Sequence, residues 1–259
     1  MQVIILCGGA GTRISGGDRT VKKEMVEIGE RPILWHIMKI FAAYGHQDFV
    51  LPLGYRGDLI RRYFLDYEMM NRDLSFTLGQ PSEPAFHDMN HESDWRITLI
   101  DTGLEANKGA RIKQVQPHIN TSPFFVTYGD GVGDVNLDHL LDFHRQHGRL
   151  ATVTGVQPNY QYGIMTLAEG DRVTGYEQYP RLGHWINAGF MLFEQTVFDY
   201  LTGDNRIDLE SGALARLAAD GQLMMYPHRG FWQSMDTFKD ALTLNELWDS
   251  GKAPWKVWP

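Results

Sequence analysis

The chain begins with Met1-Gln-Val-Ile-Ile-Leu-Cys-Gly-Gly-Ala-Gly-Thr-Arg13, an apolar stretch that runs directly into a glycine-rich turn. The apolar part, residues 2–7, predicts a buried strand. Glycines can take positive φ angles and let the backbone approach a ligand closely, so that successive N–H groups point at phosphate oxygens. The Arg13 guanidinium would add a forked cationic donor. The stretch therefore predicts a strand followed by a polyphosphate-binding loop, with glycines at Gly8, Gly9 and Gly11.

Two common phosphate-binding loops do not fit this turn. A dinucleotide-binding turn needs Gly-x-Gly-x-x-Gly, and the third glycine is missing here. A P-loop needs Gly-x-x-x-x-Gly-Lys-Ser/Thr, and Thr12 with Arg13 does not supply that lysine. On this stretch alone, a glycine-rich turn without a ligand stays open as an alternative.

Strand and helix patterns alternate along the first half of the chain. Strands are expected at 2–7, 48–53 and 124–128, and helices at 32–44, 57–70 and 137–147. Such alternation predicts an α/β fold with a mostly parallel, Rossmann-like sheet and helices on both faces. Ligands bind beyond the carboxyl ends of the strands in such sheets.

The second half is richer in strands. They are expected at 151–156, 163–167, 173–176, 185–193 and 223–227, with helices at 209–220 and 237–248. No repeat or Pro/Gly-rich linker divides the chain. We therefore expect a single domain over 1–259.

Composition limits the possible functions. The 259 residues are 43% hydrophobic and 22% charged, as in ordinary globular proteins. The formal net charge of −8 argues against general binding to nucleic acid or anionic membranes. The single cysteine, Cys7, excludes an intramolecular disulfide and is interpreted as a small buried residue. With no targeting or membrane-spanning pattern, the expected location is the cytoplasm.

Further motifs continue in order along the chain. They are Lys23-Glu-Met-Val-Glu-Ile-Gly29, Pro32-Ile-Leu-Trp-His-Ile-Met38, Gly54-Tyr-Arg-Gly57, Leu99-Ile-Asp-Thr-Gly103, Arg111-Ile-Lys113, Thr127-Tyr-Gly-Asp-Gly-Val132, Asn187-Ala-Gly-Phe190, Gly230-Phe-Trp-Gln-Ser-Met-Asp-Thr237 and Gly251-Lys-Ala-Pro-Trp-Lys256. Their joint occurrence resembles the nucleoside-diphosphate-sugar pyrophosphorylases, and most closely the glucose-1-phosphate cytidylyltransferases among them. The resemblance implies the glycosyltransferase-A-like nucleotidyltransferase fold, with 1–150 as mainly the nucleotide-binding half of the domain and 151–259 as mainly the acceptor-binding half.

The resemblance also implies an activity. The protein would join CTP to a phosphorylated acceptor, first of all glucose 1-phosphate, giving CDP-glucose and pyrophosphate with Mg²⁺ as cofactor. Cytidylylation of another phosphorylated sugar, polyol or non-sugar metabolite is the alternative. A nucleotide sensor without turnover is a further one, but a sensor has no need for the complete set of Arg13, Lys23, Asp130 and Asp236.

Site residues follow from the resemblance, position by position. Arg13 would clamp pyrophosphate and Lys23 would contact the reacting phosphates, although Lys22 could exchange roles with Lys23. Asp130 and Asp236 would hold the metal, because hard carboxylate oxygens suit Mg²⁺. The expected nucleotide-binding residues are Leu6, Gly8, Gly9, Gly11, Thr12, Thr102, Gly103, Arg111 and Asp130. The expected acceptor-binding residues are Gly163, Gln178, Tyr179, Arg181 and Asn187.

The chain departs from the family pattern at three places. Lys22-Lys-Glu-Met25 stands where the family usually has Pro-Lys-Pro-Met, and we expect Glu24 to point outward. Gln178-Tyr-Pro180 replaces Glu-Lys-Pro, and Gln161 replaces an arginine. The last two changes remove positive charge near the acceptor and favour a changed acceptor, unless Arg181 or His184 compensates.

Residues 80–93 form the longest irregular excursion. Their histidines and carboxylates lack the spacing of a zinc site, so a solvated loop is expected: His87, Asp88, His91 and Glu92. In the family this region is an extended hairpin associated with oligomer contacts, and it is flanked here by Phe86 and Trp95. The aromatic and methionine-rich stretch from Tyr63 to Trp95 predicts a homo-oligomer.

Overall fold

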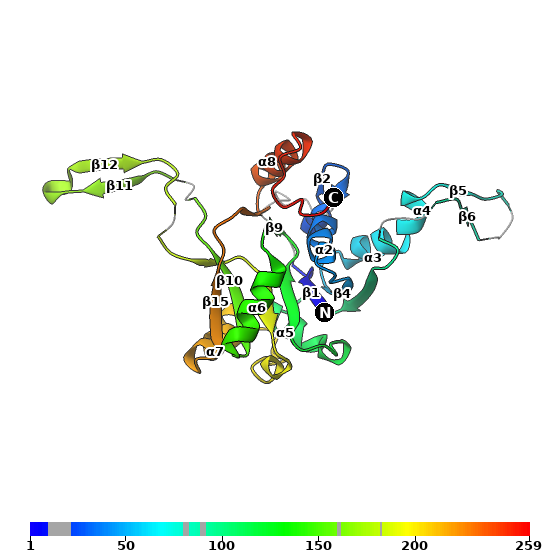
Figure 1. Ribbon diagram of the computed structural model, residues 1–259, viewed down its shortest axis with the longest axis horizontal. Coiled ribbons are helices and arrows are strands. Elements are labelled where there is room, and N and C mark those ends of the chain that lie inside the picture. The colour runs from blue at the N-terminus through cyan, green and yellow to red at the C-terminus, as the bar shows by residue number, and fades with distance from the viewer. Residues whose placement is uncertain (10–21, 80–82, 89–91, 160–161, 182) are drawn as a thin grey trace.

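One mixed, mostly parallel sheet organises the protein, as the computed structural model in Figure 1 shows. The structure describes residues 1–9, 22–79, 83–88, 92–159, 162–181 and 183–259. Within these residues the sheet has eight strands in the order β13-β10-β14-β8-β1-β4-β7, with β15 paired to β10. Strands β8, β1, β4 and β7 are mutually parallel, whereas β14 runs antiparallel to β8. The strands are β1 Gln2–Leu6, β4 Asp48–Leu53, β7 Arg96–Asp101, β8 Phe124–Tyr128, β10 Ala151–Val156, β13 Ile186–Asn187, β14 Met191–Phe193 and β15 Leu223–Pro227.

Helices cover both faces of this sheet, because alternate residues of a strand point to opposite sides. Val3 and Ile5 of β1 pack in one buried cluster with α2, α6 and α8, and Ile4 and Leu6 pack in a second with α5 and α7. The helices are α2 Ile33–Ala43, α3 Gly57–Leu65, α4 Tyr67–Asn71, α5 Lys108–Gln114, α6 Leu137–His147, α7 Ala215–Ala219 and α8 Phe238–Asp249, with the π-helix η5 Glu210–Leu214 directly before α7. Short 3-10 turns are η1 Lys23–Met25, η2 Gln116–His118, η3 Glu169–Asp171 and η4 Gln195–Asp199. The predicted α/β class is confirmed. None of the described helices combines the length and apolarity needed to cross a membrane.

The predicted strands at 48–53, 124–128, 151–156 and 223–227 are observed with the same bounds. The single strand predicted at 185–193 is wrong, because Gly189 and Phe190 have φ angles of 79° and 46° and separate β13 from β14. The helix predicted at 57–70 ends and restarts at Asp66, which lies between α3 and α4. The helix predicted at 209–220 begins as a π-helix.

Two small antiparallel pairs lie close to the carboxyl end of the sheet. Strand β9 (Gly131–Gly133) pairs with β16 (Trp232–Ser234), and β2 (Glu27–Ile28) pairs with β3 (Arg31–Pro32). The first pair joins the loop after β8 to the segment before α8. It therefore brings together two parts of the chain that are about a hundred residues apart in sequence.

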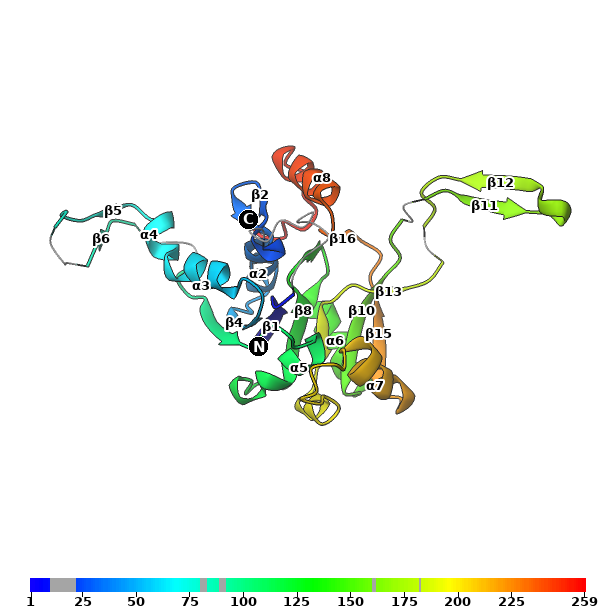
Figure 2. The ribbon, with the colours of Figure 1, turned by 180° about the vertical axis from the view of Figure 1, so that it is seen from behind.

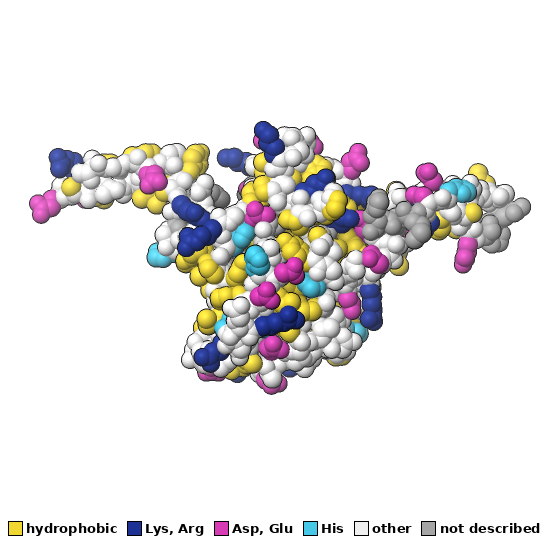
Figure 3. Space-filling view, in the orientation of Figure 1, with side chains coloured by type: hydrophobic (Ala, Val, Ile, Leu, Met, Phe, Trp, Pro, Cys, Tyr) yellow, Lys and Arg dark blue, Asp and Glu magenta, His cyan; other side chains and the backbone are white. Residues whose placement is uncertain are grey.

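Two hairpins project from opposite ends of the body (Figures 1 and 2). One pairs β5 (Leu74–Ser75) with β6 (Ala85–Phe86), and the other pairs β11 (Ile164–Leu167) with β12 (Val173–Glu177). Residues 85 and 86 were expected in a solvated loop, but they form a strand, as the family resemblance implied. Both hairpins carry exposed hydrophobic side chains: Phe76 and Leu78 on the first, and Tyr162, Met165, Leu167 and Tyr176 on the second. Figure 3 shows hydrophobic side chains along β11–β12.

Candidate active site

Lys23, Asp130 and Asp236 form a compact charged cluster at the carboxyl end of β8. The Lys23 Nζ atom lies 2.7 Å from Asp130 Oδ2 and 2.8 Å from Asp236 Oδ1. The β9–β16 pairing places the two aspartates side by side, and the Met235 N–H donates to the Asp130 carbonyl at 2.8 Å. Three residues that were predicted to act together therefore meet at one point.

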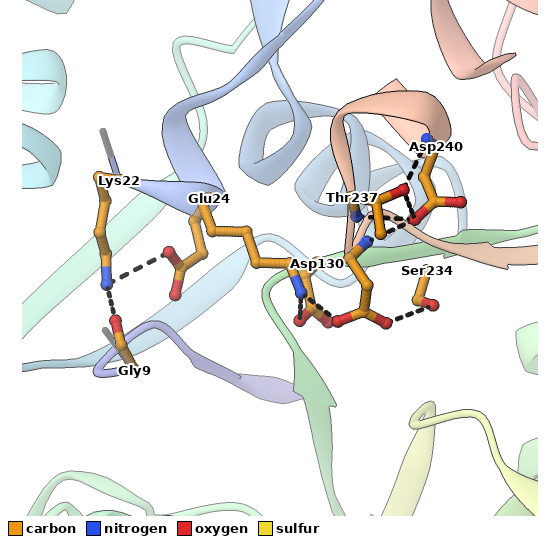
Figure 4. A network of polar contacts seen from close by, with 9 residues as sticks. Gly9, Lys22, Glu24, Asp130, Ser234, Thr237 and Asp240 are labelled. Atoms are coloured by element: carbon orange, nitrogen blue, oxygen red, sulfur yellow. Dashed lines mark hydrogen bonds and ion pairs between the residues drawn. The ribbon is translucent and has the colours of Figure 1, made fainter. Parts of the chain in front are cut away.

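Local hydrogen bonds fix the Asp236 carboxylate. Its Oδ2 accepts from the Ser234 hydroxyl at 2.9 Å, and its backbone N–H donates to Asp240 Oδ2 at 3.0 Å (Figure 4). Asp240 is the third residue of α8 and forms a capping box with Thr237, the N-cap. The start of α8 therefore sets the position of Asp236.

Electrostatics keep Lys23 charged. Burial acts to lower the pKa of Lys23, but Asp130 and Asp236 outweigh it and leave the pKa above its usual value. The side chains of Asp130 and Asp236 are 32% and 30% exposed, so both carboxylates stay accessible while they share one ammonium. Because two carboxylates share one ammonium, the cluster keeps a net negative charge that would stabilise a further cation.

The two carboxylates fit a divalent metal by their chemistry. They are hard oxygen donors that converge on one cation, which is the arrangement that Mg²⁺ uses together with substrate phosphates. Across the part of the chain that the structure describes, no group of three or more His, Cys, Asp or Glu side chains is placed to hold a metal. The remaining ligands would therefore come from phosphate oxygens and water.

A cavity of about 680 Å³ opens beside this cluster. Most of the expected nucleotide-binding residues within the described ranges line it. The lining includes Leu6, Gly8, Gly9, Lys23, Arg111 and Asp130, together with Glu24, Tyr55, Lys108, Tyr128 and Gly129. Gly11, Thr12 and Arg13 lie outside the described residues. The size and polar lining of the cavity suit a ligand as large as a nucleotide.

Arg111 lies beneath the glycine-rich loop and is only 4% exposed. Its guanidinium donates to Thr102 Oγ1 at 2.6 Å, to the Gly103 carbonyl at 2.8 Å and to the Gly8 carbonyl at 3.1 Å. A Cβ atom on Gly8 would lie 2.2 Å from Arg111 Cζ, so only glycine fits there. Arg111, Thr102 and Gly103 are thus brought together as expected, and contact of Arg111 with cytosine or phosphate stays a prediction.

Lys22 and Glu24 flank Lys23 and turn away from it. The expectation that Glu24 points outward is wrong, because its side chain is 7% exposed and lies 3.2 Å from Lys22 Nζ. Lys22 also donates to the Gly9 carbonyl at 2.8 Å, and it does not line the cavity. Of Lys22 and Lys23, Lys23 is therefore the one that faces the cavity.

Asn187 is the expected acceptor residue that lies nearest to the cavity wall. Its Nδ2 donates to the Tyr128 hydroxyl at 2.9 Å, and that hydroxyl donates to Glu210 Oε1 at 2.6 Å. Lys108 Nζ donates to the same Glu210 oxygen at 2.8 Å. Sequence reasoning missed Tyr128, Glu210 and Lys108, although the position of Tyr128 two residues before Asp130 could have indicated it.

The other expected acceptor residues lie on or beside the β11–β12 hairpin, away from the cavity lining. Gln178 Oε1 accepts from the Tyr176 hydroxyl at 3.0 Å, and Arg181 Nε donates to the Gln157 carbonyl at 3.0 Å. Tyr179 is 56% exposed and has a φ angle of 55°. Gly163 lies beside the exposed Tyr176, whose hydroxyl would have to move to admit a Cβ atom. Gln161 lies outside the described residues.

Cys7 takes no part in this chemistry. Its side chain is fully buried at the end of β1. Burial, and next the negative charge of Glu24, raise the pKa of the Cys7 thiol well above its usual value. A protonated, inaccessible thiol is a poor nucleophile, in agreement with the structural role expected for it.

The parallel sheet, the cavity at its carboxyl edge and the lysine–aspartate cluster define the class of α/β proteins that handle phosphorylated nucleotides. A model of the nucleotidyl transferase family matches residues 2–250. The chain belongs to this family, and the predicted resemblance is confirmed.

Similar proteins cover the whole chain. It is 41% identical over 258 residues to a probable glucose-1-phosphate cytidylyltransferase of Bacillus subtilis, with 100% of both chains covered. It is 39% identical over 260 residues to a glucose-1-phosphate cytidylyltransferase of Salmonella typhimurium, again over 100% of both chains. A crystal structure of a putative glucose-1-phosphate thymidylyltransferase from Bacillus anthracis shares the fold, with a TM-score of 0.69, 15% identity and coverage of 95% of this chain and 94% of that one.

Proposed function

We propose that the protein transfers the cytidylyl group of CTP to glucose 1-phosphate. A phosphate oxygen of the acceptor attacks the α-phosphorus of CTP, the bond to the bridging oxygen of the β-phosphate breaks, and CDP-glucose and pyrophosphate form. The observation that carries this proposal is the full-length likeness to two glucose-1-phosphate cytidylyltransferases. The convergence of Lys23, Asp130 and Asp236 beside a nucleotide-sized cavity supports it.

Positioned charges would do most of the catalytic work, because this kind of transfer needs little covalent chemistry from the protein. Lys23 would contact the reacting phosphates, and Arg13 would clamp the departing pyrophosphate. Asp130 and Asp236 would hold Mg²⁺. When bound, the metal would neutralise phosphate charge and polarise the phosphoryl oxygens. The Lys23 ammonium would then compete with the metal for these carboxylates, because Lys23 lies between them in the structure.

Another phosphorylated acceptor is the second candidate. Gln178 and Tyr179 supply no positive charge, and the Arg181 side chain is already engaged by the Gln157 carbonyl. An acceptor with a different sugar or alcohol would place different demands on these positions. The reaction class and the role of the cluster are the same for both candidates.

A substrate panel separates the two candidates. The protein is incubated with Mg²⁺, one of CTP, UTP, dTTP, ATP or GTP, and one acceptor phosphate at a time, and pyrophosphate release is followed. We expect the highest rate with CTP and glucose 1-phosphate. A higher rate with another acceptor would select the second candidate, and no release with any pair would contradict the proposed transfer.

We also propose that copies of the chain associate. Isolated two-stranded hairpins are marginally stable in water, yet both hairpins expose large hydrophobic side chains in a single copy. Packing against a second copy would bury them in a closed assembly. Light scattering at micromolar protein concentration tests this, and a monomer would contradict it.

A further inference from the structure

Two oppositely charged side chains are buried side by side beneath the glycine-rich loop. Lys22 and Glu24 are 2% and 5% exposed, and Lys22 Nζ lies 3.2 Å from Glu24 Oε2. Burial of a single charge is very costly, and a buried pair persists only with good geometry and further hydrogen bonds. We therefore expect the buried pair to serve the fold or the function of the site.

The pair connects two loops of the site. On one side, Lys22 Nζ donates to the Gly9 carbonyl at 2.8 Å (Figure 4). On the other side, Glu24 packs against Gly129, where an added Cβ would lie 2.8 Å from Glu24 Cγ. Gly129 directly precedes Asp130. One ion pair thus joins the start of the phosphate loop to the loop that carries a metal-ligand candidate.

The backbone of η1 makes the three neighbouring side chains diverge. The Met25 N–H donates to the Lys22 carbonyl at 2.9 Å, and the Val26 N–H donates to the Lys23 carbonyl at 3.1 Å. Lys22 and Glu24 lie on one side of this tight turn, whereas Lys23 reaches Asp130 on the other. Holding the Lys22 and Glu24 side chains in place therefore also fixes the backbone position from which the Lys23 side chain extends.

We propose that the Lys22–Glu24 ion pair is a positioning element for the triphosphate of the nucleotide. This inference rests on the proposed function. A charge-assisted hydrogen bond to the Gly9 carbonyl fixes the peptide plane at that point of the loop. Lys22 also offsets the charge of Glu24, a cavity-lining carboxylate that would otherwise repel phosphates.

The departure from the family pattern agrees with this role. Both prolines of Pro-Lys-Pro-Met are replaced here, and their two replacements pair with each other. Proline stiffens a segment by fixing φ. The ion pair provides stiffness by a cross-link between side chains, and it leaves Lys23 in the same place in the motif.

A double-mutant cycle on nucleotide binding tests the proposal. The variants are Lys22→Met, Glu24→Gln and the two combined, and the measurement is the Kd for CTP with Mg²⁺ by calorimetry, without acceptor. Lys22→Met should raise the Kd about tenfold to a hundredfold, the range for losing one charge-assisted hydrogen bond. Glu24→Gln should raise the Kd by less, because the loss of the hold on Lys22 is partly offset by the loss of a charge that repels phosphate. The combined variant should bind CTP no more weakly than Lys22→Met does, because Glu24 has no Lys22 ammonium left to hold in position.

Lys113→Met is the matched control. Lys113 Nζ donates to the Phe198 carbonyl at 2.7 Å, so this change also removes a lysine–carbonyl bond, but outside the cavity. The Kd for CTP should stay unchanged in this variant. The KM for the acceptor should stay unchanged in all four variants, because the pair touches only the nucleotide side.

Unchanged CTP binding by a folded Lys22→Met variant would overturn the inference, as would an equal loss in Lys113→Met. If Lys22→Met does not fold, Glu24→Gln decides, since the amide keeps the shape and an acceptor but removes the charge. A lower Tm with an unchanged Kd would make the pair purely structural and would also overturn it. Absence of CTP binding by the unchanged protein would contradict the proposed function itself, which distinguishes the two failures.

Discussion

The floor and the β11–β12 hairpin carry the two halves of one expected site, and they are built in opposite ways. The floor comprises Lys23, Glu24, Arg111 and Asp130 of the cavity lining and the adjoining Lys22 and Asp236. On the floor, Lys22, Lys23 and Arg111 are each less than 10% exposed and are held by several hydrogen bonds. On the hairpin, Gln178 and Tyr179 are exposed and are held by few contacts. The proposed nucleotide side is thus fixed within one copy of the chain, whereas the proposed acceptor side is not.

The two regions also differ in how they accommodate departures from the family pattern. On the floor, Lys22 and Glu24 depart together and neutralise each other, because a lone buried charge would be strongly destabilising. On the hairpin, Tyr179 stands where the family has a lysine, so a positive charge is lost. The exposed position tolerates this loss, because a charge in solvent carries no comparable energetic penalty. If the hairpin binds the acceptor as proposed, substitutions there can change substrate choice while the floor keeps its charge balance.

The largest effect is expected where the floor would hold the metal. Asp130→Asn and Asp236→Asn should each lower kcat by at least about 10²–10³-fold, because a neutral amide is a poor ligand for a hard cation. Turnover at several Mg²⁺ concentrations measures this, with Asp142→Asn on the exposed side of α6 as control. Near-normal rates in either variant would show that the floor does not hold the metal.

A pH series tests whether buried titratable groups in the body of the protein make its free energy of unfolding depend on pH. His36 is fully buried, its Nε2 lies 2.9 Å from the Ile28 carbonyl, and its Nδ1 faces Trp255 Nε1 at 3.4 Å. Burial lowers the pKa of His36 to about 4. The unfolded chain binds a proton near pH 6.5 but the folded protein does not, so stability falls as pH decreases from about 6.5 toward 4.

At pH 5 this difference corresponds to a loss of about 2 kcal/mol in the free energy of unfolding relative to pH 7.5. Urea unfolding at both pH values measures it. His36→Gln should reduce the pH dependence, whereas His139→Gln, at an exposed position of α6, should leave it unchanged. An equal pH dependence in all three proteins would assign the effect to other groups.

The acceptor half gives a smaller, substrate-dependent effect. If the acceptor has changed, Gln178→Glu combined with Tyr179→Lys should improve activity with glucose 1-phosphate by about tenfold or more, the value of one charge-assisted hydrogen bond to phosphate. If glucose 1-phosphate is the substrate, Arg181→Ala or His184→Ala should instead raise its KM. Full activity of the unchanged protein that neither alanine variant alters would contradict both explanations.

The sequence predicted the body better than the site, for physical reasons. Strands such as 48–53 are continuous buried runs, so their hydrophobic pattern alone defines them. Lys23, Asp130 and Asp236 could be assigned because motifs and strand ends mark them. The Lys22–Glu24 pair and the Tyr128–Glu210 contact could not be predicted, because each depends on neighbours that only the tertiary structure brings together. The break in the strand predicted at 185–193 was missed because the hydrophobic pattern does not report the positive φ angles at 189 and 190.

The smallest effect on stability is expected on the hairpin itself. Met165 and Leu167 are 57% and 58% exposed on β11, so Met165→Ser with Leu167→Ser should change the free energy of unfolding of a dilute single copy by no more than about 0.5 kcal/mol. Leu140→Ala in the buried face of α6 is the matched contrast and should cost about 2–5 kcal/mol. The same serine changes should weaken self-association measured by light scattering, because about 25 cal/mol is lost for each Å² of apolar surface that a second copy no longer buries. A loss of more than about 1 kcal/mol in the dilute single copy would mean that the hairpin packs on its own body, and the contrast between a fixed floor and a free hairpin would then be wrong.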